Sequence, residues 1–517
     1  MRSTNVFKNI SIGIMSRTLT QILGFVVRTI FVYSLPTDFL GINGLFTSIF
    51  AFLNLSELGL SSAIVYALYK PLAQKDETKI KQLVRFYKQA YTIIGGVVAT
   101  MGVLLLPALP YLAKGGTTSI NMYAIYLVFL FETVTSYWFW AYKSSLLVAD
   151  QKEYIISITK NIMDVIKAII RIIFLLVLKD YPASSFYVYV VIGIVSTIIS
   201  NWLIGKRVYI TYPFLKDLEY EKLPIVERNA ILKNVLGLSA YRISGTINNA
   251  VDALLISSFL GLVVNGIYAN YELIISTVNS LIWIIVTALI PSVGNINFTE
   301  NNEKKYFLFK CIGLALFWVY GFCGISLWVL LNPFIGGVWL NDSFLLSEKA
   351  VFVLFINFIT GGMLTVFSIF VEATGQFSRR GWASIASAVI NVILSIILLK
   401  VTNWGIGGVV LATVCARIIV VVPAYIKIIS KDVFSKNIGK FWIMYIGTMG
   451  LTLITGLGVK GIVLTFEGDN LLFFLIKALI CVFCVNVSWF LIFRKTKEFV
   501  YLMDVVKLVM TKIKNRK

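Results

Sequence analysis

The sequence predicts an all-α membrane protein with fourteen transmembrane helices. The first observation is its composition: 58% of its 517 residues are hydrophobic and only 14% are charged, with a mean hydropathy of +0.85. A soluble domain has a smaller fraction of hydrophobic residues and a larger fraction of charged ones. The second is a succession of stretches of about 20 apolar residues, the length that crosses the hydrocarbon core of a bilayer. The third is the distribution of basic residues among the loops.

The first predicted helix already differs from a secretory signal peptide. It carries Arg17 and Arg28 and runs into Leu35-Pro36 without a small-residue cleavage pattern. Each later helix is predicted from an apolar run bounded by charged, Pro or Gly residues. The predicted spans are 10–33, 43–67, 88–111, 121–146, 154–178, 184–204, 236–260, 267–292, 308–331, 350–371, 381–400, 405–427, 441–464 and 470–493.

The loop charges support this count and orient the chain. Of the 46 Lys and Arg residues, 34 lie in regions that face one side when the fourteen spans alternate. Five lie in the opposite loops, and the other seven lie inside spans. Cytoplasmic loops of membrane proteins are enriched in Lys and Arg, so we expect both termini in the cytoplasm. This distribution also accounts for the net charge of +21 without nucleic acid as a partner.

Matched landmarks predict an internal duplication. Arg17 and Arg242 are 225 residues apart, and so are the Gly41-Ile42 and Gly266-Ile267 pairs. Six helices separate the copies, so the two halves have the same topology, as in parallel-repeat transporters. The predicted organisation is an N-lobe of helices 1–6 (1–205), a cytoplasmic connector (206–235), a C-lobe of helices 7–12 (236–430), helices 13 and 14 (431–493) and a basic amphipathic tail (494–517) that lies on the anionic inner leaflet.

Seven cations inside the predicted spans are the main functional signal. A cation at the centre of a membrane helix costs about 2.5–3.5 kcal/mol, so these residues need a use. Together they predict a cationic, water-accessible cavity whose guest is an anion. The seven residues are Arg17, Arg28, Lys167, Arg171, Arg242, Arg417 and Lys477.

Several of these cations belong to polar stripes at helical spacing. Arg17, Gln21 and Arg28 share one face of helix 1, and Asp164, Lys167 and Arg171 share a face of helix 5. The predicted substrate-binding residues are Arg17, Arg28, Arg242, Lys167, Arg171 and Gln21. Each cation also has a structural alternative. Asp164 and Lys167 could form an ion pair that lets helix 5 insert, and Arg28 could snorkel to the outer interface. Arg417 and Lys477 could line helix–helix grooves or snorkel.

The carboxylates inside the spans are the candidates for ion coupling, because the chain contains no histidine. We predict Glu57, Asp164, Asp252 and Glu272 for this role. Pairing to the arginines is the alternative for Glu57, Glu132, Asp252 and Glu272. We expect no cofactor and no metal site, although coupling to a proton or sodium gradient is open. The five cysteines lie in apolar segments, and the Cys481–Cys484 spacing is attributed to packing.

Two stretches near the N-terminus resemble a known family. Residues 28–46, RTIFVYSLPTDFLGINGLF, and residues 54–63, NLSELGLSSA, are similar to the N-terminal region of bacterial polysaccharide repeat-unit flippases. These belong to the multidrug/oligosaccharidyl-lipid/polysaccharide exporter superfamily. The resemblance implies two six-helix lobes, alternating access and a cationic cavity for an undecaprenyl-pyrophosphate-linked oligosaccharide, with cavity arginines at Arg17 and Arg28. It also implies that the protein lies in a bacterial cell membrane, with membrane lipids and the polysaccharide polymerase machinery as partners. Helices 13 and 14 would form a groove for the lipid tail.

Two other functions are open at this point. A cation-coupled multidrug exporter of the same superfamily is expected to line its pore mainly with carboxylates, whereas the spans here hold seven cations against five anions. A membrane-embedded glycosyltransferase or polymerase is expected to have a large extramembrane domain and a catalytic constellation. The longest connector has about 30 residues and no such constellation is visible, so we predict that the protein is not an enzyme.

Overall fold

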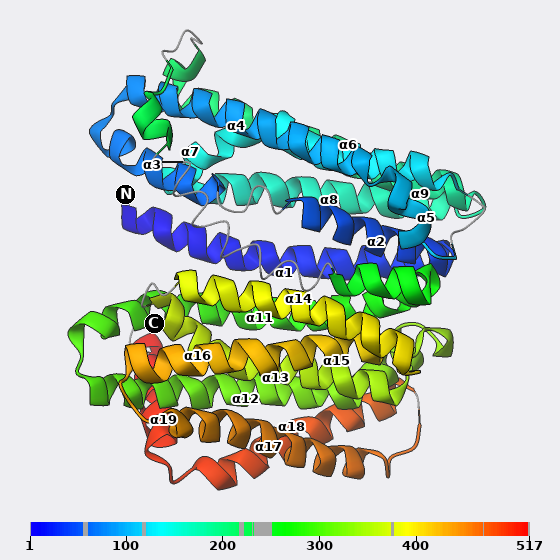
Figure 1. The fold of residues 1–517 in the computed structure, drawn as a ribbon, viewed down its shortest axis with the longest axis vertical. Helices are drawn as coiled ribbons and strands as arrows, with labels where there is room; N and C mark the ends of the chain where they lie inside the picture. Colours follow the sequence, from blue (N-terminus) through cyan, green and yellow to red (C-terminus); the bar gives the residue numbers. More distant parts are fainter. Residues whose placement is uncertain are drawn as a thin grey trace. The chain divides into compact units, whose positions relative to one another are not determined.

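The computed structural model describes residues 2–54, 60–115, 120–216, 222–229, 231, 251–373, 377–468 and 470–514 (Figure 1). Regular secondary structure in these ranges is helical throughout. The chain divides into two compact units, Met1–Ala269 and Asn270–Lys517. We describe each unit separately.

Unit 1 consists of long helices joined by short turns. Two short helical pieces, α5 and α7, follow directly on α4 and α6, and α11 begins in unit 1 and continues into unit 2. The helices are α1 (Arg2–Ser34), α2 (Thr37–Leu53), α3 (Leu60–Gln74), α4 (Glu77–Leu104), α5 (Leu109–Leu112), α6 (Met122–Trp138), α7 (Ser144–Ala149), α8 (Glu153–Val177), α9 (Pro182–Thr211), Val251–Leu260 and α11 (Leu262–Thr299).

Unit 2 is likewise built from long helices, three of which contain or end in a π-helical turn. The helices are α12 (Asn302–Phe334), α13 (Glu348–Ala373), α14 (Phe377–Val401), α15 (Ile406–Ala416), α16 (Val422–Ile428), α17 (Ile438–Val463), α18 (Leu471–Phe493) and α19 (Lys497–Lys514). The π turns are η5 (Ile335–Trp339), η7 (Arg417–Val421) and η8 (Ile429–Val433).

Local chemistry explains where many of these helices begin. Asn and Asp side chains accept a hydrogen bond from a backbone N–H of the first turn at α4, α6, α12, α17 and α18. Asp76, for example, accepts from the Lys79 N–H at 2.9 Å. Such caps satisfy N–H groups that have no partner within the helix, so a helix end marked by Asn or Asp can be predicted from the sequence.

Ten helices in the described part of the chain are long and apolar enough to cross a membrane. The protein is therefore a multi-pass membrane protein. The α8 helix has 25 residues but is not among the ten, because Lys160, Asp164, Lys167 and Arg171 lie along it. Wherever the structure describes the chain, each predicted span overlaps a helix. The count of fourteen spans, the six-helix lobes and the predicted domain boundaries stay predictions.

The duplicated glycines of the sequence lie in one reciprocal helix crossing in unit 1. A Cβ added to Gly41 in α2 would lie 1.9 Å from the carbonyl oxygen of Leu262, and one added to Gly266 in α11 would lie 2.7 Å from that of Thr37. Thr37 and Leu262 are also 225 residues apart, so each contact is the repeat equivalent of the other. The Asn265 amide donates to the Gly41 carbonyl at 3.1 Å. This reciprocity is what a two-fold relation between duplicated segments produces.

In unit 2, Trp489 fixes the α17–α18 pair to α12. Its side chain is fully buried, its ring centroid lies 4.5 Å from that of Phe317, and its Nε1 donates to the Thr455 hydroxyl at 3.0 Å. A Cβ added to Gly321 would lie 2.5 Å from the Trp489 ring. The missing side chain at position 321 therefore makes room for the indole.

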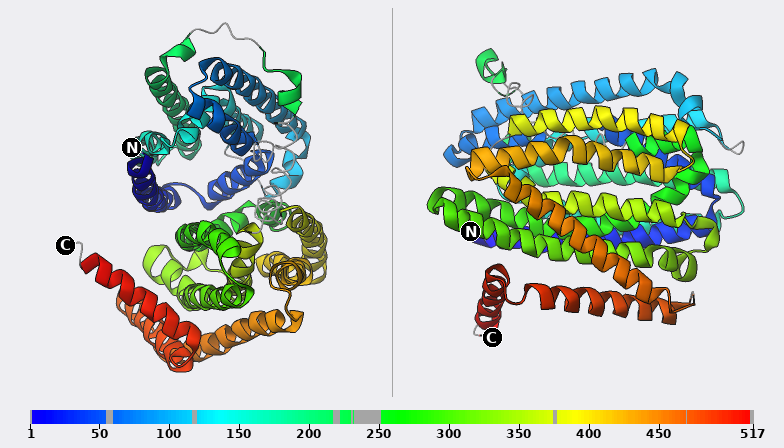
Figure 2. Two further views of the ribbon diagram at one scale, coloured as in Figure 1. Left: turned by 90° about the vertical axis from the view of Figure 1, so that its left-hand side faces the viewer. Right: turned by 60° about the horizontal axis from the view of Figure 1, so that its bottom comes forward.

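The C-terminal helix α19 runs crosswise to α18 and contacts α12 (Figure 2). Glu498 forms an ion pair with Lys310, and the Phe499 ring stacks on Trp318 with centroids 5.7 Å apart. Burial alone would raise the pKa of the Glu498 carboxyl, but the hydrogen bond and positive charge of Lys310 hold that pKa below its ordinary value. The predicted amphipathic tail is therefore a helix with a defined docking contact.

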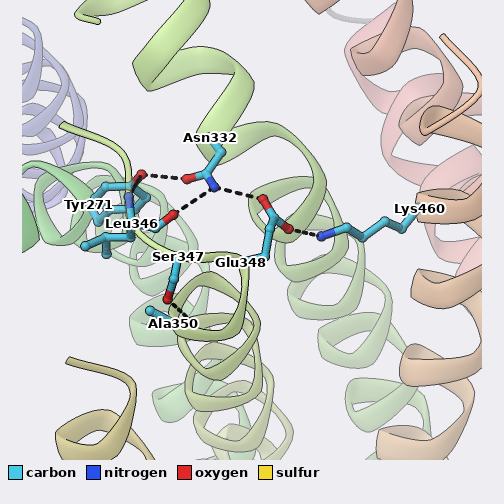
Figure 3. Close-up of polar contacts among 7 residues, drawn as sticks. All are labelled: Tyr271, Asn332, Leu346, Ser347, Glu348, Ala350 and Lys460. Atoms are coloured by element: carbon cyan, nitrogen blue, oxygen red, sulfur yellow. Dashed lines mark hydrogen bonds and ion pairs between the residues drawn. The ribbon is translucent and has the colours of Figure 1, made fainter. Parts of the chain in front are cut away.

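A polar network joins four helices of unit 2 at one end (Figure 3). The Tyr271 hydroxyl donates to Asn332 Oδ1 at 2.6 Å and accepts from the Leu346 N–H at 2.9 Å. Asn332 Nδ2 donates to the Leu346 carbonyl at 3.1 Å and to Glu348 Oε1 at 2.8 Å. Glu348 in turn pairs with Lys460 of α17. The network thus links α11, α12, α13 and α17 through groups that all have partners.

Candidate functional site

Cations of α1 and α8 converge on one tyrosine of α9. The Arg171 guanidinium lies 3.9 Å from the centroid of the Tyr189 ring, and its Nε donates to the Tyr189 carbonyl at 3.0 Å. Arg28 of α1 also interacts electrostatically with Tyr189. Phe31, one turn along α1 from Arg28, packs edge-on against Tyr189 with centroids 5.1 Å apart. The cation–π contact and the hydrogen bond hold Arg171 in place while leaving some of its N–H donors available.

Lys167 lies one turn before Arg171 on α8 and is paired with Asp164. The distance from Lys167 Nζ to Asp164 Oδ1 is 2.6 Å, and about 30% of each side chain is exposed. This is the i, i+3 pair that the sequence allowed as an alternative. Because the pair is partly exposed, the Lys167 ammonium can also be reached by a second anion. We call Arg28, Lys167 and Arg171, with Asp164, Glu132 and Tyr189, the α8 cluster.

Glu132 of α6 completes the α8 cluster from the opposite side. A Cβ added to Gly193 of α9 would lie 2.4 Å from Glu132 Oε1 and 2.7 Å from Arg171 Nη2. The carboxylate and the guanidinium therefore lie within about 5 Å of each other, over a position that only glycine leaves open. Arg171 and Lys167 are the charged groups that act on Glu132. The site holds both signs of charge and has an excess of cations.

Replacing Gly193 with Ala is expected to lower transport while leaving every charge in place. The new methyl group would force the Glu132 carboxylate and the Arg171 guanidinium apart, because both lie closer to it than real contacts allow. The measurement is transport at matched protein level. Gly96→Ala in α4 is the control, since its Cβ would enter open space. Equal activity of the two variants would contradict the assigned contact.

The other predicted site residues fall in several places. Gln21 is partly buried on α1, Asp252 is buried with 5% of its surface exposed, and Glu272 is partly buried on α11. The side chain of Arg17 lies outside the described residues, and so do Arg242 and Glu57. Their roles stay predictions.

The two remaining intramembrane cations bond to protein groups in unit 2. Arg417 Nη1 donates to the Asn357 carbonyl and to the Thr360 hydroxyl, both at 2.7 Å, and so joins the π turn η7 to α13. Lys477 Nζ donates to the Gly468 carbonyl at 2.9 Å and closes the connection between α17 and α18. These contacts correspond to the structural alternative for single charges without a stripe.

A small pocket, with a cavity volume of about 10 Å³, also lies in unit 2, between α12, α13 and α17. Gly313, Phe317, Met363, Met444 and Tyr445 are among its lining residues. None of its lining residues is charged, so this pocket offers an anion no ionic partner. In the described part of the chain, no three His, Cys, Asp or Glu residues are grouped so that they could hold a metal ion.

Two residues of the α8 cluster were not predicted as site residues. Glu132 is an acidic residue within a span, and the sequence predicts only pairing with an arginine for it. Tyr189 carries no signal in the sequence, since tyrosines are common in this chain. Both depend on which face of a helix meets its neighbour, which a single helix does not reveal.

Long apolar helices with charged residues among them define a multi-pass membrane protein. The family comparison makes this more specific. A family model described as "Polysaccharide biosynthesis protein" matches residues 6–296, more than half of the chain. The chain belongs to this family. No curated protein sequence matches it.

Several solved structures have a similar fold. Lipid II flippase MurJ in an inward closed conformation aligns with a TM-score of 0.66 and 19% identity, over 93% of this chain and 98% of MurJ. An inward-facing MATE family multidrug transporter of the MOP superfamily aligns with a TM-score of 0.62 and 14% identity, over 79% of this chain and 94% of the transporter. A mutant of the Vibrio cholerae MATE transporter VcmN aligns with a TM-score of 0.55 and 14% identity, over 84% of this chain and 99% of VcmN. At these identities the likeness shows the fold alone.

Proposed function

We propose that the protein is a flippase that moves undecaprenyl-pyrophosphate-linked oligosaccharide repeat units from the inner to the outer leaflet. The observation that carries this proposal is the α8 cluster, in which Arg28, Lys167 and Arg171 outnumber the carboxylates Asp164 and Glu132. Membership in a polysaccharide biosynthesis family supports a polysaccharide precursor as the cargo. Among the parts of such a cargo, the pyrophosphate is the one that requires cations.

The chemistry of the α8 cluster suits a pyrophosphate. Arginine presents a planar fork of N–H donors that matches phosphate oxygens, and lysine adds a compact charge. The Tyr189 ring holds the Arg171 guanidinium from one face, so less conformational freedom is lost when the anion binds. The glycan requires only hydrogen bonds and stacking surfaces, and the prenyl chain can remain in lipid.

Several features of the proposal extend it beyond the α8 cluster. Arg17 and Arg242, at equivalent positions of the duplication, would bind the pyrophosphate from the two lobes during alternating access. Both termini would lie in the cytoplasm of a bacterial cell. The polymerase that extends the polysaccharide would take the product at the outer leaflet, and no enzymatic step is required of this chain.

The proposal predicts leaflet transfer by the purified protein. Reconstituted into vesicles with fluorescent undecaprenyl-pyrophosphate oligosaccharide, the wild-type protein should expose the label to an impermeant quencher faster than empty vesicles do. A lipid of the same length with a neutral head in place of the pyrophosphate is the control substrate and should not be transferred. Equal transfer of both lipids would contradict recognition of the anion.

A further inference from the structure

Glu132 lies where an anion bound to Arg171 would also lie. Its Oε1 and Arg171 Nη2 flank the same point above Gly193 and are within about 5 Å of each other. That separation lets opposite charges attract strongly in a partly buried site but leaves the guanidinium fork open to a second partner. The other carboxylate of the α8 cluster, Asp164, is held by Lys167 at 2.6 Å.

We propose that Glu132 is an exchangeable counter-anion of the α8 cluster. When no cargo is bound, the Glu132 carboxylate balances the positive charge of Arg171. When the pyrophosphate of the cargo binds Arg171, the displaced carboxylate takes up one proton from water and becomes a neutral carboxylic acid. Release of the cargo returns the proton and restores the Glu132–Arg171 balance. This inference rests on the proposed function, because it requires that the α8 cluster binds a pyrophosphate.

The charges of the α8 cluster give the direction of this linkage. With Glu132 ionised, three cations face two carboxylates, and with Glu132 protonated, they face one. Protonation therefore strengthens anion binding. By thermodynamic reciprocity, anion binding strengthens proton binding to the same degree. A second anion beside a partly buried carboxylate disfavours its ionised form for the same electrostatic reason.

The neighbouring helices supply the groups that face Glu132. The α8 helix provides Arg171 and Lys167, and α9 provides Tyr189 and the open position at Gly193. On α1, Arg28 acts on Tyr189. Contacts described between α6 and its neighbours α2 and α4 are made by uncharged groups: Phe46, Phe50, Asn54, Thr92 and Gly102. The charges that act on Glu132 therefore come from α8.

The test measures proton uptake when an anion binds the purified full-length protein in detergent. Farnesyl pyrophosphate is the probe, and calorimetric titrations at pH 8 in two buffers of different ionisation enthalpy give the protons taken up per bound probe. Wild type should take up a measurable fraction of one proton. Glu132→Gln should take up none and should bind about tenfold more tightly, since a competing negative charge is gone.

Two further variants make the result specific. Glu153→Gln removes an exposed carboxylate at the start of α8 and should behave as wild type. Glu132→Asp withdraws the carboxylate by one methylene group and should give weaker proton uptake than wild type. Thermal unfolding of each variant shows that the protein remains folded.

The outcomes separate the inference from the function. If wild type binds the probe without proton uptake, or if Glu132→Gln binds no more tightly, the counter-anion role is wrong and the flippase proposal stands. If wild type binds no probe and transfers no lipid-linked oligosaccharide, the proposed function is wrong and this inference fails with it.

Discussion

Gly41→Ala is expected to destabilise the protein by about 3 kcal/mol or more, because it forces atoms into a backbone that has no room to move. The new methyl group would lie 1.9 Å from the Leu262 carbonyl oxygen and 2.5 Å from its carbon. A flexible side chain can move away, but here the obstacle is the first turn of α11. The helices α2 and α11 must separate, and the Asn265–Gly41 hydrogen bond is lost with the contact.

The measurement is the thermal unfolding midpoint in detergent, together with export at matched protein level. Gly266→Ala tests the reciprocal contact. It should lower the unfolding midpoint less than Gly41→Ala does, because its Cβ would lie 2.7 Å from the Thr37 carbonyl oxygen. Gly96→Ala is the control in open space and should be no less stable than wild type, because Ala favours a helix over Gly by about 1 kcal/mol. Equal unfolding midpoints of the Gly41→Ala and Gly96→Ala variants would show that α2 and α11 cross less closely than described.

Arg171→Gln is expected to reduce export at least about tenfold, since hydrogen bonds to charged groups are each worth about 1.5–3 kcal/mol. The glutamine loses the charge, the fork and the contact with the Tyr189 ring together. Arg171→Lys should restore export only in part, because an ammonium keeps the charge but not the planar geometry.

Surface polysaccharide at matched protein level is the measurement for the Arg171 variants. Arg207→Gln is the control, since Arg207 is an exposed arginine on α9 of the same unit. Wild-type export by Arg171→Gln would show that this cation only stabilises unit 1. In that case binding of the pyrophosphate would have to be assigned to other cations, with Arg17 and Arg242 first.

The helices could be predicted because most of them are long apolar runs with polar boundaries. The sequence also identified Gly41 and Gly266 as equivalent positions from their spacing alone. It did not predict that the two glycines meet, because a repeat distance carries no information on which helices cross. The Asp164–Lys167 pair could be predicted from its i, i+3 spacing on α8.

Prediction was weakest where two helix surfaces meet. Glu132, Tyr189 and Gly193 belong to the α8 cluster through the rotation of α6 and α9 about their axes, and the sequence of a single helix does not say which neighbour its faces meet. Arg417 seemed isolated in the sequence for a different reason. Its partners, the Asn357 carbonyl and the Thr360 hydroxyl, lie on α13, and the spacing of residues along its own helix carries no information about them.

The π turns have a consequence for how the rod from Ile406 to Val433 tolerates changes of length. Deleting one residue from an ordinary α-helix turns every later side chain by about 100°. A π turn already holds one residue more than an α turn, so a deletion within η7 or η8 would convert it to plain α-helix and leave the flanking faces aligned. These turns are therefore where a natural relative can differ in length by one residue while Val409 and Tyr425 still face the same neighbours.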